Sequence, residues 1–275
     1  MRLNVVIVKK KDGSNRVAID YRQLNKKTLF DTEPSVKVAD IFAQIGQAKY
    51  FSKFDMAKGY WQIPMREEDI VKTAFVTPDG SYEFLRMPFG LMNSGASFTR
   101  MMRKLTKGMS GIQHYIDDCL IYSDDWETHL RVVGEFLQRV RAANLTIRPS
   151  KCEVGCSQLE FVGHEVKRGE VGLQEANVGK VRDAPRPETK KQVRSFLGLT
   201  GYYRDYIPGY AEVAAPLTDL TKKGKPNQVQ WDRQCEESYA RLRQSLLDRP
   251  VLRLPDLGRE WTLRVDASDS VGDLG

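Results

Sequence analysis

Three aspartates beside predicted strand ends are the residues of this sequence best suited to do chemistry. Asp117 and Asp118 are adjacent and lie between two short apolar segments, while Asp55 ends the predicted strand 51–55. Neighbouring side chains on a regular strand point to opposite faces, so both members of the pair can address one site only where the chain turns. We therefore predict a hairpin tip at this pair of acids.

Three carboxylates gathered at one place would need cations. If the two strand ends adjoin in one sheet, the repulsion between the acids is tolerable mainly when divalent ions neutralise it. Hard oxygen ligands select Mg²⁺ or Mn²⁺, and two such ions promote in-line displacement at phosphorus. Two alternatives stay open at this point, because an Asp-Asp pair in a turn is usually part of a solvated loop and a glycosidase carboxylate pair would also fit the acids.

Positive charge is concentrated in two regions of the chain. The 275 residues include 43 lysines and arginines against 36 aspartates and glutamates, a net charge of +7. Residues 1–30 hold eight basic and two acidic side chains, and a second basic region spans residues 180–204. Two separated positive regions suit a groove that binds a polyanion at two places, whereas a solvated charged surface is the alternative. A glycosidase would leave the N-terminal region without a role.

Composition excludes several classes of protein. Hydrophobic residues make up 41% of the chain, which is enough to build real cores. The longest apolar runs, such as residues 5–8, are far shorter than the roughly 18 residues that a bilayer span needs, so we expect neither a membrane span nor a secretory precursor. The four cysteines form neither a zinc motif nor a dense disulfide framework, and we expect free thiols in a reducing, intracellular compartment.

Hydrophobic periodicity predicts an α+β fold around these acids. Strands are expected at 5–9, 16–20, 50–55, 72–77, 82–87, 112–116, 119–122, 161–166 and 261–265. Helices are expected at 38–45, 94–107, 126–143, 190–206 and 236–247. Turn signals at 12–13 and 78–80 predict hairpins.

The sequence resembles the reverse transcriptase of gypsy-type LTR retrotransposon pol polyproteins over essentially its whole length. Each short motif is weak alone, but their joint occurrence in this order is specific. The motifs are VKKKDGSNRVAIDYRQLNKKT, AKYFSKFDMAKGYWQIP, KTAFVTPDGSYEFLRMPFGL, YIDDCLIYS, KCEVGCSQLEFVGHEV, KKQVRSFLGLTGYYRDYIP, AAPLTDLTKK and VDASD.

The resemblance implies a right-hand polymerase fold with fingers, a palm built on a small antiparallel sheet, and a helical thumb, followed by the truncated start of an RNase H-like domain. Residues 1–165 would form the fingers and palm, residues 166–225 the thumb, and residues 226–275 the connection and the first part of the RNase H-like domain. Asp266 matches the first RNase H carboxylate, but only nine residues follow it (275 minus 266). We therefore expect no ribonuclease H activity from this chain.

The activity implied by the resemblance is RNA-directed DNA polymerisation. Such a nucleotidyltransferase extends a DNA primer on an RNA or DNA template with dNTPs, in the cytoplasm within a retrotransposon particle. The resemblance assigns two Mg²⁺ ions, with Mn²⁺ as an alternative, to Asp55, Asp117, Asp118 and the backbone carbonyl of Met56. A nucleic-acid-binding remnant without turnover and an RNase H-type nuclease are the competing hypotheses.

The resemblance also assigns substrate contacts. Lys10 and Arg16 would hold the triphosphate of the incoming nucleotide, and Tyr60 would be an aromatic gate beneath its sugar. The expected wall of the nucleotide pocket consists of Phe89 and Gly90. The turn expected to grip the primer end consists of Phe161, Val162, Gly163 and His164. Without the surrounding motifs, the aromatic residues and the histidine would be interpreted as ordinary packing residues.

Overall fold

The structure is a computed structural model that describes residues 4–9, 13, 15–34, 36–255, 260 and 262. Its strands are β1 (Val5–Lys9), β2 (Asn15–Ile19), β3 (Tyr50–Asp55), β4 (Phe75–Thr77), β5 (Gly80–Tyr82), β6 (Ile112–Tyr115), β7 (Asp118–Ser123), β8 (Glu153–Cys156), β9 (Gln158–Phe161), β10 (His164–Lys167), β11 (Glu170–Leu173) and β12 (Val251–Arg253). Its helices are α1 (Arg22–Asn25), α2 (Val38–Ile45), α3 (Glu67–Ile70), α4 (Ser94–Leu105), α5 (Trp126–Ala142), α6 (Glu175–Asp183), α7 (Lys190–Tyr202), α8 (Tyr210–Leu220) and α9 (Arg233–Leu247), with 3₁₀ turns η1 (Gly59–Gln62), η2 (Val71–Thr73), η3 (Pro149–Lys151) and η4 (Arg204–Tyr206).

The central sheet has the strand order β6-β7-β3-β8, and all neighbouring strands are antiparallel. Alternate residues send apolar side chains to its two faces. Phe54 and Ile121 pack with residues of α4 and α5 on one face, while Phe51 and Leu120 pack with α2 and strands of the second sheet on the other. Because each face packs against a different core, a slip of one residue would send every side chain of β3 to the wrong face, so the register of β3 against β7 is strongly specified.

A second sheet, of order β12-β11-β10-β9, is also antiparallel. The prediction of a single strand over residues 161–166 is wrong, because the chain reverses direction at Val162 and Gly163 between β9 and β10. These residues have φ angles of 44° and 72°, and glycine at the second position makes the left-handed conformation inexpensive there. His164 then pairs back against Phe161.

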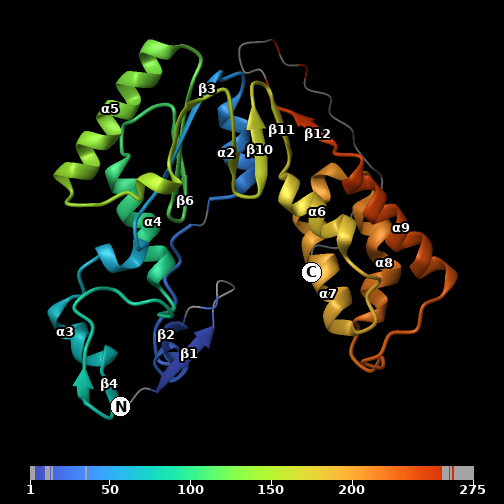
Figure 1. Cartoon of the computed structure of the whole chain (residues 1–275), viewed down its shortest axis with the longest axis horizontal. Helices are drawn as coiled ribbons and strands as arrows, with labels where there is room; N and C mark the ends of the chain where they lie inside the picture. The colour runs from blue at the N-terminus through green and yellow to red at the C-terminus, as the bar shows by residue number, and fades with distance from the viewer. Residues whose placement is uncertain are drawn as a thin grey trace.

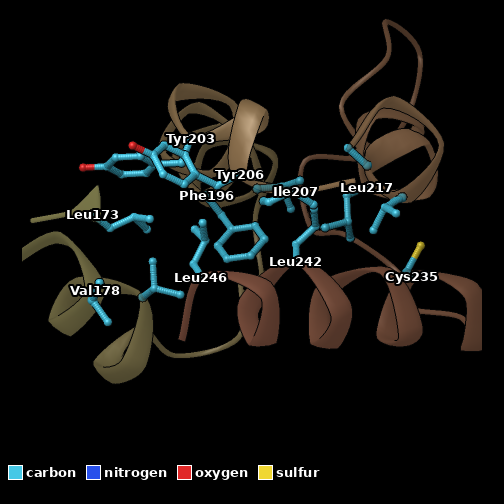
Figure 2. Packing of buried hydrophobic residues seen from close by; sticks show 14 of the residues in the cluster. Leu173, Val178, Phe196, Tyr203, Tyr206, Ile207, Leu217, Cys235, Leu242 and Leu246 are labelled. Atoms are coloured by element: carbon cyan, nitrogen blue, oxygen red, sulfur yellow. The ribbon is translucent and has the colours of Figure 1, made fainter. Parts of the chain in front are cut away.

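Helices α6–α9 form a separate cluster with its own core. Phe196 of α7, Leu217 of α8 and Leu246 of α9 are buried together, as Figure 2 shows. The helix predicted over residues 190–206 ends at Tyr202 and is followed by η4. The domain boundaries at 165 and 225 stay predictions; β10 runs across the first of them, and α9 packs against α8 across the second.

Figure 1 shows two arms joined by the two four-stranded sheets. One arm carries the β1–β2 hairpin, α3 and the short β4–β5 hairpin, and the other carries α6–α9. The base of the first hairpin is anchored by Ile19 and Tyr21, which pack against Phe75 and Phe84. Among the described residues, no helix is both long enough and apolar enough to cross a membrane. All four cysteines are free thiols.

A fully buried histidine connects α5 to the central sheet. The Nε2 atom of His129 lies 2.7 Å from Ser52 Oγ, and its Nδ1 atom lies 2.9 Å from Ser123 Oγ. The Ser123 hydroxyl donates to the Asp125 carbonyl at 3.0 Å, so the Nδ1 atom must carry the proton that it shares with Ser123. Ser52 Oγ accepts a bond from the Gly155 N–H at 2.9 Å and donates to Nε2. This chain of hydrogen bonds fits the neutral imidazole ring.

Burial of the histidines predicts a loss of stability in mild acid. Burial lowers the pKa of His129, and it also lowers the pKa values of His114 and His164. Unfolding therefore takes up protons, so this contribution to stability is complete above the unfolded pKa of about 6.5 and is lost as the pH falls below it. We expect the free energy of unfolding, measured with urea, to fall between about pH 7 and 5. In His129→Gln the slope should be smaller, since one of the three groups is removed; an unchanged slope would contradict this.

Candidate active site

The central sheet brings the three predicted acids to one of its ends. Asp55 at the end of β3 and Asp118 at the start of β7 are directly opposite each other in the antiparallel register. Tyr115 of β6 pairs with Asp118 from the other side, so Ile116 and Asp117 form a two-residue turn. Ile116 has a φ of 55°, which is an outlier for a β-branched residue. The predicted hairpin is present, and its turn takes Asp117 out of the ladder.

The negative charges at this end of the sheet influence one another. Burial raises the pKa of Asp118 above its ordinary value, and the charges of Asp117 and Asp55 raise it further. Lys53 and Lys151 act in the opposite direction. The Nζ atom of Lys151 lies 3.5 Å from Asp55 Oδ2. Three carboxylates therefore lie within electrostatic reach of one another, with two lysines partly balancing their charge.

The three aspartates supply carboxylate oxygens, which are suitable ligands for a hard divalent cation. Throughout the part of the chain that the structure describes, no three His, Cys, Asp or Glu side chains are grouped so that they could already hold a metal ion. Carboxylate oxygens that repel one another at a strand end are nevertheless the ligands that Mg²⁺ and Mn²⁺ prefer. The backbone also ties the two strand ends together, since the Met56 N–H donates to the Asp117 carbonyl at 3.2 Å. The Met56 carbonyl accepts a long bond of 3.4 Å from the Gly59 N–H.

A groove of about 410 Å³ adjoins the carboxylates. It is lined by Lys53, Asp55, Asp118, Lys151, Glu153, Glu160, Val162, Gly163 and Gln174. The acids of the central sheet thus share a groove with the β9–β10 turn of the second sheet. A larger cavity of about 720 Å³, lined by Leu24, Met65 and Arg100 among others, contains none of the predicted site residues. We place the candidate active site at the smaller groove because the carboxylates of Asp55 and Asp118 line it.

The four residues predicted to grip the primer have different surroundings. Phe161 is buried, and the buried ring of His164 lies 4.9 Å from Phe42, centroid to centroid. The Nδ1 atom of His164 donates to the Val162 carbonyl at 2.8 Å. Val162 and Gly163 line the groove instead. Phe161 and His164 therefore anchor the turn, while the two residues between them face the acids.

The predicted sugar gate lies beside the acidic turn. Tyr60, in η1, is half-buried, with its ring 5.3 Å from that of Phe89 and 5.7 Å from that of Phe98. Burial raises the pKa of Tyr60, and the charge of Asp117 adds to this rise. A Cβ atom placed on Gly59 would lie 3.8 Å from the Cβ of Asp117. The structure therefore brings Tyr60, Phe89 and Asp117 into one neighbourhood.

Four predicted functional residues remain: Gly90, Arg16, Lys10 and Asp266. Gly90 has a φ of 96°, and a Cβ there would lie 3.4 Å from the Tyr21 ring. Arg16 lies on β2 opposite Val8. Lys10 and Asp266 lie outside the described residues.

Comparison with known proteins identifies the family. The sequence model described as "Reverse transcriptase (RNA-dependent DNA polymerase)" matches residues 8–166. This chain belongs to the reverse transcriptase family. It is 38% identical over 271 residues to the Retrovirus-related Pol polyprotein from transposon 297 of Drosophila melanogaster, covering 96% of this chain and 25% of that one. It is 33% identical over 269 residues to the corresponding polyprotein from transposon gypsy, covering 94% and 26%.

The predicted gypsy-type relationship of this chain is therefore confirmed, and the chain spans about a quarter of the length of these relatives. A foamy viral protease-reverse transcriptase solved in complex with double-stranded DNA matches it with a TM-score of 0.85 and 25% identity, over 92% of this chain and 45% of that one. A foamy viral structure in complex with RNA/DNA hybrid matches with a TM-score of 0.84 and 24% identity, over 92% and 34%. These matches confirm the right-hand polymerase fold.

Two lysines beside the acids were missed by the sequence reasoning. Lys53 forms an ion pair with Glu153 at 2.5 Å and donates to the Glu160 carbonyl at 2.9 Å. The sequence does contain a signal for Lys53. Residues two apart on a strand share a face, and Lys53 stands two residues before Asp55 on the same predicted strand. Lys151 had no such signal, since it lies 96 residues beyond Asp55.

Part of the second basic region of the chain has a structural role. Lys190 Nζ donates to the Lys222 carbonyl at 2.8 Å, and Arg194 Nη2 donates to the Thr221 carbonyl at 2.9 Å. Both carbonyls lie just past the end of α8, where helices leave acceptors unpaired and favour cations. These two side chains therefore cap α8.

Proposed function

We propose that this chain is an RNA-directed DNA polymerase that extends a DNA primer on an RNA or DNA template with dNTPs. The observation that carries the proposal is the register of the central sheet, with Asp55 opposite Asp118 and Asp117 in the adjoining turn. Family membership supports the same chemistry. A foamy viral relative in complex with RNA/DNA hybrid supports the choice of substrate.

The three aspartates are proposed to hold two Mg²⁺ ions, or Mn²⁺, together with the Met56 carbonyl. When bound, the ions would activate the primer hydroxyl and stabilise the charge that develops on the phosphate. The chain itself contributes fixed geometry, because the β3–β7 ladder sets the separation of Asp55 and Asp118. Lys151, whose Nζ atom lies 3.5 Å from Asp55 Oδ2, places a positive charge beside these ligands.

The substrate contacts are proposed on two sides of these acids. On the nucleotide side, Lys10 and Arg16 would bind the triphosphate, and Tyr60 would pack beneath the sugar against a wall made by Phe89 and Gly90. On the primer side, the turn of Phe161, Val162, Gly163 and His164 would seat the 3′ end. The shared groove of Asp55, Asp118, Val162 and Gly163 supports the second assignment.

The larger organisation follows from the same proposal. Residues 1–165 would act as fingers and palm, residues 166–225 as thumb, and residues 226–275 as the connection and the N-terminal part of an RNase H-like domain. We propose that the enzyme acts in the cytoplasm, within a retrotransposon particle.

Primer extension on an RNA template tests this function. With a 5′-labelled DNA primer, four dNTPs and Mg²⁺, we expect products that extend to the end of the template, and we expect EDTA to abolish them. The matched control is the same reaction with Ca²⁺ in place of Mg²⁺. Binding of the primed template without any extension, in either Mg²⁺ or Mn²⁺, would instead support a binding remnant without turnover.

A further inference from the structure

The tip of the β9–β10 hairpin has a backbone that needs external support. Val162 and Gly163 both have positive φ angles, and a β-branched residue adopts this conformation only where its surroundings impose it. The carbonyls of these two residues accept hydrogen bonds from outside the strand ladder. Tyr202 Oη donates to the Val162 carbonyl at 2.6 Å, and Tyr203 Oη donates to the Gly163 carbonyl at 2.5 Å. The position of the tip therefore depends on these tyrosines.

Tyr203 is itself held in place by a second residue. The Asn177 side chain on α6 donates from Nδ2 to the Tyr203 hydroxyl at 2.7 Å. A Cβ atom added to Gly163 would lie 3.3 Å from both the Tyr203 hydroxyl and Asn177 Nδ2. Tyr203 is only 1% exposed, so its side chain has no surface to offer to nucleic acid. Tyr202, in contrast, is 44% exposed.

The tip supported by Tyr203 faces the acids. Val162 and Gly163 line the same groove as Asp55 and Asp118, whereas Tyr203 is not among the residues that line it. The hydroxyl of Tyr203 thus acts on the groove through the backbone of the tip, and Asn177 links it to a lining side chain by donating to Gln174 Oε1 at 3.2 Å. Loss of that bond would leave the Gly163 carbonyl with the longer bond of 3.3 Å from the Gln174 N–H.

We propose that Tyr203, oriented by Asn177, is a positioning residue that sets the distance between the primer 3′ end and the catalytic aspartates. This inference rests on the proposed function and adds a residue that never touches the substrate. Small displacements of reacting atoms cost large factors in rate. In the proposed function, the tip contacts the primer and not the nucleotide. Tyr203→Phe should therefore lower kcat and leave the KM for dNTP nearly unchanged.

The test compares two Tyr→Phe variants from one aromatic cluster. Tyr206 is 6% exposed, its ring centroid lies 6.0 Å from that of Tyr203, and its hydroxyl donates to the Val171 carbonyl at 3.3 Å. Tyr206→Phe therefore removes one buried hydroxyl without touching the tip. For each variant we would measure urea stability, kcat and KM for one nucleotide, and the fluorescence of a primer with 2-aminopurine at its 3′ end. The fluorescence reports primer seating without turnover.

We expect Tyr203→Phe to lower kcat about tenfold and to change the fluorescence, with Asn177→Ala moving both in the same direction. Tyr206→Phe should lose similar stability but keep kcat within about twofold of the wild type. Wild-type kcat and fluorescence in Tyr203→Phe, or equal slowing in both Phe variants, would overturn the inference. If the wild-type chain never extends primers, but the fluorescence of the bound primer changes in Tyr203→Phe and Asn177→Ala and not in Tyr206→Phe, the polymerase is refuted and the role of Tyr203 in seating the primer is still supported.

Discussion

Replacing Asp117 or Asp118 with asparagine should abolish polymerisation while leaving binding of the primed template largely intact. Asparagine keeps the shape of the side chain but removes the negative charge that a metal ligand supplies. The loss of transition-state stabilisation should lower the rate by about a thousandfold or more. Affinity should survive, because contacts to the phosphate backbone come from basic side chains elsewhere. Single-nucleotide incorporation and a binding titration on the same primed template measure the two effects separately.

The matched control for these variants is Asp124→Asn. Asp124 is exposed, lies just past the end of β7 and carries the same charge, so its replacement should leave the rate within about twofold. Extension at a near-wild-type rate by either Asp117→Asn or Asp118→Asn would refute the assignment of the site.

Shrinking Tyr60 should relax the choice between deoxyribonucleotides and ribonucleotides. Its ring is half-buried against Phe89 and Phe98 and cannot easily retreat, because closely packed side chains yield little. A ribose 2′-hydroxyl placed over the ring would therefore clash with it. Relief of about 3 kcal/mol of clash in Tyr60→Val or Tyr60→Ala corresponds to about a hundredfold change in discrimination. The measurement is the ratio of dNTP to rNTP efficiency on one primed template.

The control for this prediction is Tyr60→Phe, which keeps the ring and should keep the wild-type ratio. If Tyr60→Val folds and polymerises with an unchanged ratio, Tyr60 is a packing residue and selects no sugar.

Elements with regular apolar patterns could be predicted from the sequence almost to the residue. The helix 38–45 ends at Gly46, whose φ of 55° suits glycine, and α5 begins after Asp125, whose side chain accepts a bond from the Thr128 N–H. The β9–β10 turn could not be predicted from pattern, because a valine in the left-handed conformation carries no local signal. Contacts with Tyr202 and Tyr203, about 40 residues away, support it.

The acidic part of the candidate site followed from the sequence because two neighbouring acids between apolar segments require a turn. From the residues alone, the meeting of Asp55 with the pair Asp117 and Asp118 depends on two distant strands lying side by side, and the register of β3 against β7 meets this condition. The contacts of Lys151 and Tyr203 could not be derived, since each depends on how separate elements pack. The acidic turn and local residue chemistry could therefore be predicted from the sequence, whereas contacts between residues far apart in the chain could not.

Templated incorporation of a single nucleotide on RNA tests the central claim most directly. A DNA primer annealed to four RNA templates, which differ only in the next template base, is offered each dNTP separately with Mg²⁺. We predict that each template directs the addition of its complementary nucleotide, and that the Asp118→Asn variant adds none. Addition that ignores the template base, or no addition by the wild-type chain while it binds the primed template, would contradict an RNA-directed DNA polymerase.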